Sequence, residues 1–317
     1  MSRPPLLLAD IGGTNARFAL DRDGEIEQIA TLLVADYPTA AAALAAVLQE
    51  LPADARPRAA AFACAGPVIE GAVSLTNSPW RLEALELERR FALERVLLVN
   101  DLAAVAWAVP HFRTDQLRAV GGGTPQTEQP SVVIGPGTGL GVAAFLPPPG
   151  PRVISGEGGH ATLAAADDRE AEVLSRLRAE LGHVSAERLL SGDGLIRLYE
   201  TISAIDGTTA GPRTPAEISD AALAGRCPAC RQALDMFCAM LGTFAGNLAL
   251  TWGAKGGVYI SGGIVPQIAS DFAASGFRGR FEAKGRFRPY LAAIPTYLVL
   301  HPEPAFLGLS RLMAAAS

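Results

Sequence analysis

The sequence has 317 residues and a mass of 33.0 kDa, and its 27 Lys and Arg residues are outnumbered by 32 Asp and Glu. With 49% hydrophobic and 19% charged residues the chain is globular, and its length suits two domains. Only Lys255 and Lys284 are lysines, and neither stands in the Gly-Lys-Ser/Thr run of a Walker A loop or in a Val-Ala-Ile-Lys-like kinase strand. A mildly acidic chain without basic blocks is also a poor nucleic-acid binder. Any phosphate site must therefore work without lysine.

The first hundred residues alternate between strand-like and helix-like patterns, which is typical of α/β architecture with a mixed sheet. The expected strands are 6–9, 17–20, 25–34, 58–65 and 95–99, with a hairpin at 67–75 and helices at 39–51, 82–91 and 101–109. A patch rich in Gly, Pro and Gln at 121–130 resembles a linker, and a new series of strand-like and helix-like segments begins after it. We therefore expect a change of domain near 110–130.

The second part of the chain begins with strands and continues mostly as helix. Its expected elements are strands at 131–134, 140–146 and 257–260, a helical region over 167–252 with a loop at 206–214, and a closing helix at 303–316. These patterns predict a small α/β domain over 1–110, which the C-terminal helix at about 302–317 joins, and a large α/β domain over 111–301.

The sequence also favours a soluble protein of a reducing cytoplasm. The apolar run that begins at Leu6 is too short for a signal peptide, and the longest uncharged stretch, 236–252, is shorter than the roughly 20 residues of a membrane span, so a buried helix is expected there. Four cysteines without an export signal fit a reducing compartment. The pair Cys227 and Cys230 lacks the second pair of a structural zinc site and the βαβ context of a thioredoxin-like site, so its role stays open.

One internal repeat organises the rest of the sequence. Residues 6–20 and 132–145 each read as an apolar strand, a Gly-Gly-Thr or Pro-Gly-Thr turn, and a second apolar strand. Glycine turns let backbone N–H groups approach a phosphate, and a Thr hydroxyl adds a further donor. Two such hairpins suggest duplicated domains that face each other across a cleft, although a tight hairpin without a ligand would give the same pattern.

Acidic residues follow two of the expected strands. Asp10 precedes the first glycine turn, and a carboxylate beside a phosphate requires an intervening cation such as Mg²⁺. A turn-initiating Asp is the alternative. Asn100 and Asp101 stand between a strand and a helix, where Asp101 is a natural N-cap. The same position would aim an ionised carboxylate at the ligand-binding edge of the sheet, where it could accept a proton from a hydroxyl nucleophile.

Three further segments carry polar groups or glycines of interest. Glu157 and His160 flank two glycines in a bent loop, which suits a polyol ligand better than the His-Glu-x-x-His helix of a zinc protease. Glu187 is expected in the first turn of a helix, where a structural role is commonplace. Gly262 and Gly263 follow a strand and precede a helix, which offers a flat backbone surface to a base or an anion.

Taken in order, these segments resemble the bacterial ATP-dependent glucokinases of the actin/hexokinase-like superfamily, from Leu6 to about Gly308. The resemblance implies a two-domain actin/hexokinase-like (ribonuclease H-like) fold with a central cleft. It implies phosphorylation of D-glucose at the 6-hydroxyl, the first step of glycolysis, by a cytoplasmic homodimer that uses ATP and Mg²⁺. The cysteines of the related zinc-containing kinases and repressors do not follow His160, so the chain is similar to the zinc-free type.

The resemblance also assigns residues to roles. Asp101 matches the catalytic base, and Asn100, Asp101, Glu157, His160 and Glu187 match the sugar ligands. The nucleotide-binding positions that it implies are Ala9, Asp10, Ile11, Gly12, Gly13, Thr14, Gly137, Thr138, Gly262 and Gly263. Asp10 would hold Mg²⁺ through water. The acceptor could still be fructose, mannose or an amino sugar, and the donor ADP or polyphosphate. A sugar-sensing regulator of the same fold would be expected to carry a helix-turn-helix extension before the first strand.

Overall fold

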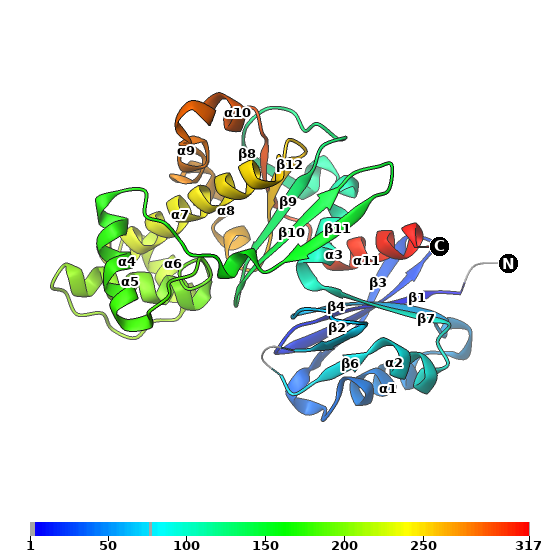
Figure 1. Cartoon of the computed structure of the whole chain (residues 1–317). Coiled ribbons are helices and arrows are strands. Elements are labelled where there is room, and N and C mark those ends of the chain that lie inside the picture. The colour runs from blue at the N-terminus through cyan, green and yellow to red at the C-terminus, as the bar shows by residue number, and fades with distance from the viewer. Residues whose placement is uncertain (1–3, 76–77, 317) are drawn as a thin grey trace. The chain divides into compact units, whose positions relative to one another are not determined.

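The computed structural model describes residues 4–75 and 78–316, so the first three residues of the N-terminal segment considered above lie outside it. The chain divides into two compact units. The small unit comprises Met1–Phe112 and His301–Ser317, and the large unit comprises Arg113–Leu300. Both are α/β structures (Figure 1).

The small unit is built on a five-stranded mixed sheet with strand order β3-β2-β1-β4-β7. Its elements are β1 (Leu6–Ile11), β2 (Asn15–Arg22), β3 (Glu25–Leu33), α1 (Ala40–Glu50), β4 (Ala59–Cys64), β5 (Ala72–Ser74), β6 (Arg81–Glu83), α2 (Ala84–Phe91), β7 (Arg95–Asn100), α3 (Asp101–Ala108) and α11 (Pro304–Ala315). Strands β1, β4 and β7 run parallel, and β2 is antiparallel to both of its neighbours, β1 and β3. The carboxyl ends of the parallel strands β1, β4 and β7 therefore meet at one edge of the sheet.

Helices cover both faces of this sheet. Side chains alternate along β1, so Leu7, Ala9 and Ile11 face a core shared with α1, while Leu8 and Asp10 point to the opposite face. Helices α3 and α11 pack on that opposite face (Figure 1). The two helices approach closely because position 308 is glycine: a Cβ there would lie 1.7 Å from a main-chain oxygen of α3.

The large unit repeats this sheet with one added strand. Its elements are β8 (Leu117–Gly121), β9 (Ser131–Pro136), β10 (Leu140–Leu146), β11 (Arg152–Gly156), α4 (Asp168–Leu181), α5 (Gly192–Ile205), α6 (Pro215–Leu223), α7 (Pro228–Trp252), β12 (Gly257–Ile260), α8 (Ala269–Ala274), α9 (Phe277–Glu282), α10 (Arg288–Ala292) and β13 (Thr296–Val299). The strand order is β11-β10-β9-β12-β13-β8, with β9, β12 and β13 parallel. Five strands thus match the small unit in order and direction, which supports the inferred duplication.

Helix α7 is the core of the large unit, in the region where a buried helix was expected. It contacts α5, α6 and α9 as well as strands β9 and β12 (Figure 1). Among the described residues it is the one helix long and apolar enough to cross a membrane, but 67% of its most apolar window is buried inside the protein. Burial within the large unit therefore accounts for its apolar composition.

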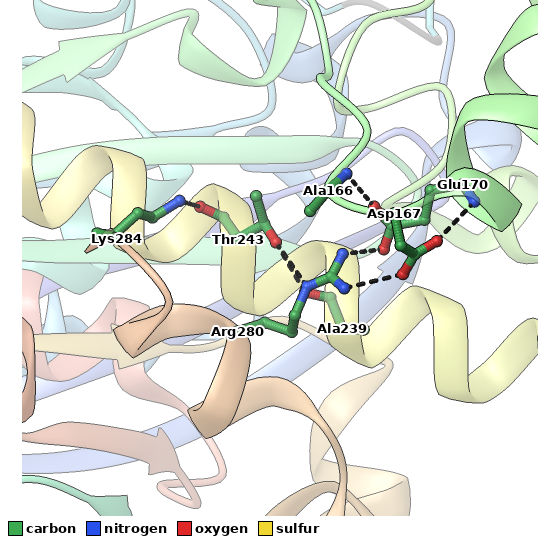
Figure 2. A network of polar contacts seen from close by, with 7 residues as sticks. All are labelled: Ala166, Asp167, Glu170, Ala239, Thr243, Arg280 and Lys284. Atoms are coloured by element: carbon green, nitrogen blue, oxygen red, sulfur yellow. Dashed lines mark hydrogen bonds and ion pairs between the residues drawn. The ribbon is translucent and has the colours of Figure 1, made fainter. Parts of the chain in front are cut away.

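A polar network ties α9 to α7 and to the start of α4 (Figure 2). Arg280 on α9 forms ion pairs with Asp167 and with Glu170, whose side chain is almost fully buried, and its Nε donates to Thr243 Oγ1 at 3.3 Å. Lys284 Nζ donates to the main-chain oxygen of Thr243 at 3.0 Å. Because Arg280 pairs with Glu170, the buried carboxylate is not left alone in the core.

Candidate functional site

In the small unit the polar residues of interest gather where the parallel strands end. The register places Ile11, Cys64 and Asn100 side by side, and Asp101 follows at once as the first residue of α3. Asp10 lies one residue earlier in β1, close enough for its negative charge to act on Asp101. Ligands of open α/β sheets bind at this carboxyl edge.

Asn100, rather than Asp101, caps helix α3. Its Oδ1 accepts from the backbone nitrogens of Leu102 and Ala103 at 3.0 and 3.2 Å, so the prediction of Asp101 as the N-cap was wrong. The ladder to Cys64 keeps Asn100 in extended backbone, which leaves it as the last residue before the helix. Asp101 Oδ1 accepts from the Leu102 nitrogen at 2.8 Å. The capping bonds therefore fix both side chains at the sheet edge.

The carboxyl of Asp101 is a weaker acid than usual. Burial raises its pKa from 3.8 to about 6, and the nearby Asp10 adds to the rise. Hydrogen bonds from the Leu102 backbone and the Asn100 side chain oppose the rise only in part. A carboxylate with a pKa near 6 is ionised at neutral pH and is still basic enough to take a proton from a hydroxyl group.

Asp10 has a positive partner that was not predicted. Arg17 Nη2 lies 2.9 Å from Asp10 Oδ2, and Arg17 Nη1 lies 3.0 Å from both carboxylate oxygens of Glu303. Burial raises the pKa of Asp10, and the Arg17 guanidinium acts against that rise. Arg17 could have been found in the sequence, because it is a charged residue that alternates with the apolar Ala16 and Phe18 in a strand.

The carboxylate of Asp10 fits the way Mg²⁺ is usually held beside phosphates. Among the described residues no cluster of three or more His, Cys, Asp or Glu side chains forms a protein cage for a metal. Mg²⁺ commonly keeps several waters and takes one or two carboxylates together with substrate phosphates. Asp10 would hold the ion in that manner, and the bound ion would neutralise charge on the phosphates.

The first glycine turn is closed by its own backbone. Gly12 donates its N–H to the oxygen of Asn15 at 2.9 Å, so this donor belongs to the turn, while Thr14 is exposed at its tip. Ala9 and Ile11 are 0% and 2% exposed and lie within ladders on both sides of β1. They shape the turn, and the exposed groups around Thr14 are the ones available to a ligand.

In the large unit Glu157, His160 and Glu187 come together. His160 Nε2 lies 3.7 Å from Glu157 Oε2, and His160 Nδ1 lies 3.7 Å from Glu187 Oε1. Glu187 Oε2 accepts from the Leu140 nitrogen at 2.9 Å, and its own nitrogen donates to the oxygen of Gly159 at 2.8 Å. This cluster offers carboxylate acceptors and an imidazole to a polyol ligand.

Two features of this cluster differ from or add to the sequence interpretation. Glu187 lies in a turn and not at a helix start, because helix α5 begins only at Gly192. Sequence reasoning also missed the importance of Gly159, where a Cβ would lie 2.0 Å from the oxygen of Leu140. Only glycine allows the 157–160 loop to approach β10 so closely.

The second glycine turn and the later glycine pair share one end of the large sheet. Gly137 donates to the oxygen of Gly139 at 2.8 Å and accepts from the nitrogen of Gly192, the first residue of α5. Gly262 has a φ of +89°, and a Cβ there would lie 2.4 Å from the oxygen of Pro136. Strands β9 and β12 are parallel neighbours, so this contact follows from their register. Thr138, Gly262 and Gly263 are exposed there.

The two α/β units have matching strand orders, and each carries a glycine turn between two antiparallel strands, β1 and β2 in the small unit and β9 and β10 in the large unit. These features define the actin/hexokinase-like class of phosphotransferases. A family model described as Glucokinase matches residues 7–316. The glucokinase of Paramagnetospirillum magneticum is 50% identical over 97% of both chains, and that of Nitrobacter hamburgensis is 45% identical over 96% of both. The crystal structure of a glucokinase from an Antarctic psychrotroph has a TM-score of 0.89 at 37% identity and covers 98% of this chain and 99% of its own.

The chain therefore belongs to the glucokinase family and is a hexose kinase. These findings confirm the family and the fold class that the sequence motifs predicted. A ROK-family glucokinase from Streptomyces griseus, crystallised with glucose and AMPPNP, has the same fold, with a TM-score of 0.68 at 22% identity over 97% of this chain and 98% of its own.

Proposed function

We propose that this hexose kinase carries out the ATP-dependent phosphorylation of glucose at the 6-hydroxyl with Asp101 as the general base. The observation that carries the proposal is the position of Asp101, at the carboxyl edge of the small sheet and with a pKa raised to about 6. Asp101 takes the hydroxyl proton as the sugar oxygen attacks the γ-phosphorus. The bond from that phosphorus to the bridging oxygen breaks, so the products are glucose 6-phosphate, ADP and a proton.

The same proposal gives the sugar ligands their roles. The side chains that we propose as ligands of the glucose hydroxyls are Asn100 and Asp101 in the small unit and Glu157, His160 and Glu187 in the large unit. The 3.7 Å spacings from His160 to both glutamates support this, because the three side chains can share neighbouring hydroxyls. Their task is positioning, which supplies much of the catalysis when the transition state is loose.

The two glycine turns are the segments that we propose for binding the nucleotide phosphates. Thr14 and Gly13 on the small unit, and Gly137 and Thr138 on the large unit, would meet the phosphates, with Gly262 and Gly263 toward the adenosine. The exposure of Thr14, Thr138 and both later glycines supports this assignment. Mg²⁺ would be held through water by Asp10. ATP is the donor we propose, as the AMPPNP complex of the Streptomyces griseus protein suggests.

The physiological setting follows from the same reaction. We place it at the first step of glycolysis, in the cytoplasm, with the enzyme acting as a homodimer. Light scattering of the purified chain would measure the assembly directly, and a monomer at micromolar concentration would overturn the dimer.

A coupled assay tests the activity. With glucose, ATP and Mg²⁺ we expect stoichiometric ADP and glucose 6-phosphate, with lower kcat/KM for fructose, mannose and glucosamine. In parallel reactions, ADP or polyphosphate is supplied as the phosphoryl donor in place of ATP. Glucose binding without phosphoryl transfer from any of the three donors would refute the kinase and favour a sugar-sensing protein.

A further inference from the structure

The start of helix α7 holds two cysteines that the proposed reaction does not use. Cys227 is the N-cap residue of this 25-residue helix, and its Sγ accepts a hydrogen bond from the Cys230 nitrogen at 3.4 Å. Residues three apart on a helical turn have Cβ atoms about 5–6 Å apart, so a small adjustment brings the two sulfurs to bonding distance. The two cysteines are thus placed for a disulfide without a change of fold.

The two thiols differ in access to solvent. Cys227 is partly exposed, whereas Cys230 is 0% exposed and packs in the core of the large unit. The other two cysteines, Cys64 and Cys238, are both fully buried. Cys227 is therefore the thiol that a dissolved reagent reaches first, and Cys230 is a partner that only Cys227 can reach.

The surroundings of Cys227 also favour its thiolate. Burial alone would raise the pKa of Cys227, but it is outweighed by hydrogen bonds from the Cys230 thiol and two backbone amides and by the charge of Arg213, so the pKa falls below its usual value. Burial and the bond to Cys227 raise the pKa of Cys230 to about 11. The Arg213 guanidinium is held over the ring of Tyr199 on α5, 5.9 Å from its centroid. Reactive cysteines occur in such electropositive, partly exposed places.

We infer that Cys227 and Cys230 form a reversible dithiol–disulfide pair, a modification site whose oxidant is a low-molecular-weight disulfide. The Cys227 thiolate attacks one sulfur of that disulfide, and the first small thiol leaves with a proton. The Cys230 thiol then loses its proton and attacks Cys227 of the mixed disulfide, which releases the second small thiol. The protein loses two electrons, and the small disulfide gains them. This inference does not depend on the proposed kinase mechanism.

Two simpler roles make different predictions. Within the described residues the pair has no further His, Cys, Asp or Glu close enough to complete a metal site. As a mere helix cap, Cys227 would be replaceable by Ser, which is a preferred N-cap, and the wild type would show no preferred reaction at this pair.

The experiment treats the reduced full-length chain with oxidised glutathione, quenches with acid, alkylates and maps the peptides. We expect a 227–230 disulfide in the wild type that dithiothreitol reverses. Cys230→Ser should stop with one glutathione on Cys227, whereas Cys227→Ser should leave Cys230 unmodified. At pH 7, iodoacetamide should label Cys227 at least about ten times faster than Cys230, and Arg213→Met should slow that labelling. Cys238→Ser is the matched control and should behave as the wild type.

Three results would overturn the inference: first modification at Cys64 or Cys238, equal labelling of Cys227 and Cys230, or a wild type that stays reduced or ends as a mixed disulfide. Circular dichroism checks that each variant is folded. If the Cys227→Ser variant does not fold, peptide mapping of the wild type and of the Cys230→Ser variant still tests the inference.

Discussion

Arg17 and Asp10 are paired across strands β1 and β2, with their Cα positions in register and Nη2 of the arginine 2.9 Å from Oδ2 of the aspartate. The pair lies on the sheet face that α3 and α11 cover, and Arg17 extends from it to Glu303 at the start of α11. Burial raises the pKa of Asp10, the proposed Mg²⁺ residue, and the positive charge of the neighbouring Arg17 opposes that rise. We regard Arg17 as a positioning residue for the proposed magnesium site.

Replacing Arg17 by Met should weaken the use of Mg²⁺ more at low pH than at high pH. Arg17 lowers the pKa of Asp10, so its loss raises that pKa, and more of the carboxyl is protonated as the pH falls. We expect the free Mg²⁺ concentration for half-maximal rate to rise about three- to tenfold at pH 6.5 and less at pH 8.5. Initial rates at controlled free Mg²⁺ measure this.

Glu303→Gln supplies the control for that experiment. Glu303 raises the pKa of Asp10 by its negative charge, so its removal should leave the Mg²⁺ requirement unchanged or lower at pH 6.5. If Arg17→Met instead increased the apparent affinity for Mg²⁺, Arg17 would be a competitor of the metal and our assignment would fail.

Asp101→Asn should abolish most turnover while glucose still binds. The amide keeps the shape and the hydrogen bond from Leu102 but cannot accept the hydroxyl proton, so we expect kcat to fall about 10²- to 10⁴-fold. In the wild type, kcat/KM should fall about tenfold per pH unit below about 6, because the base must be ionised. Steady-state rates and calorimetric glucose titration test both points. A variant with near-normal kcat would remove Asp101 as the base.

The same substitution should make the protein more stable at neutral pH. The pKa of Asp101 is about 6 in the folded protein and near 3.8 when unfolded, so the folded state holds its proton more tightly. The free energy of unfolding therefore falls as the pH rises from about 4 to 6 and stays level above that. The contribution of this group to the fall is at most about 3 kcal/mol. Urea unfolding of wild type and Asp101→Asn at pH 4.5 and 8 should show a stability gain for the variant that is larger at pH 8. An equal difference in stability between wild type and variant at both pH values would contradict a cost of burying the Asp101 carboxylate.

The sequence was sufficient to predict the elements that depend on residues close together in the chain. The two glycine-turn hairpins and helix α7 depend on apolar runs and turn residues within a few positions of one another. The fold class and family followed from motifs of this kind and are confirmed. Strands β8, β11 and β13 were missed because short segments such as Arg152–Gly156 carry a weak pattern and form only when a neighbouring strand pairs with them.

The details of the site depend on contacts between distant positions. Asn100 and Asp101 are both good helix caps, and the choice between them rests on where the ladder to Cys64 ends. Glu187 lies in a turn because its carboxylate accepts from Leu140, 47 residues away in the chain. Neither contact leaves a signal in the local sequence, so the residue types could be predicted but not their geometry.

Gly159→Ala should damage the sugar cluster, whereas Gly158→Ala should not. A Cβ at 159 would lie 2.0 Å from the Leu140 oxygen, which must move and carry the Glu187 contact with it. At 158 the nearest atom is Val142 Cγ2 at 3.4 Å, an ordinary contact. We expect a rise of at least about tenfold in KM for glucose, or a loss of about 1–3 kcal/mol in stability, for the first variant only. Kinetics and thermal melts of both measure this, and matching behaviour would refute the role given to Gly159.

Lys255 and Lys284 should be dispensable to the chemical step, because both already have structural partners and neither belongs to the glycine turns at residues 12–14 and 137–139. Lys284 Nζ donates to the Thr243 oxygen and, at 2.6 Å, to Asn247 Oδ1 (Figure 2 shows the first contact), and Lys255 lies 5.5 Å from the ring centroid of Tyr290. We expect Lys255→Met and Lys284→Met to keep kcat within about twofold and to lose about 0.5–1.5 kcal/mol of stability. Lys284→Arg is the matched control that keeps the charge. A tenfold fall in kcat with unchanged melting temperature in either Met variant would mean that the phosphates depend on lysine after all, and that the glycine turns with their threonines do not suffice.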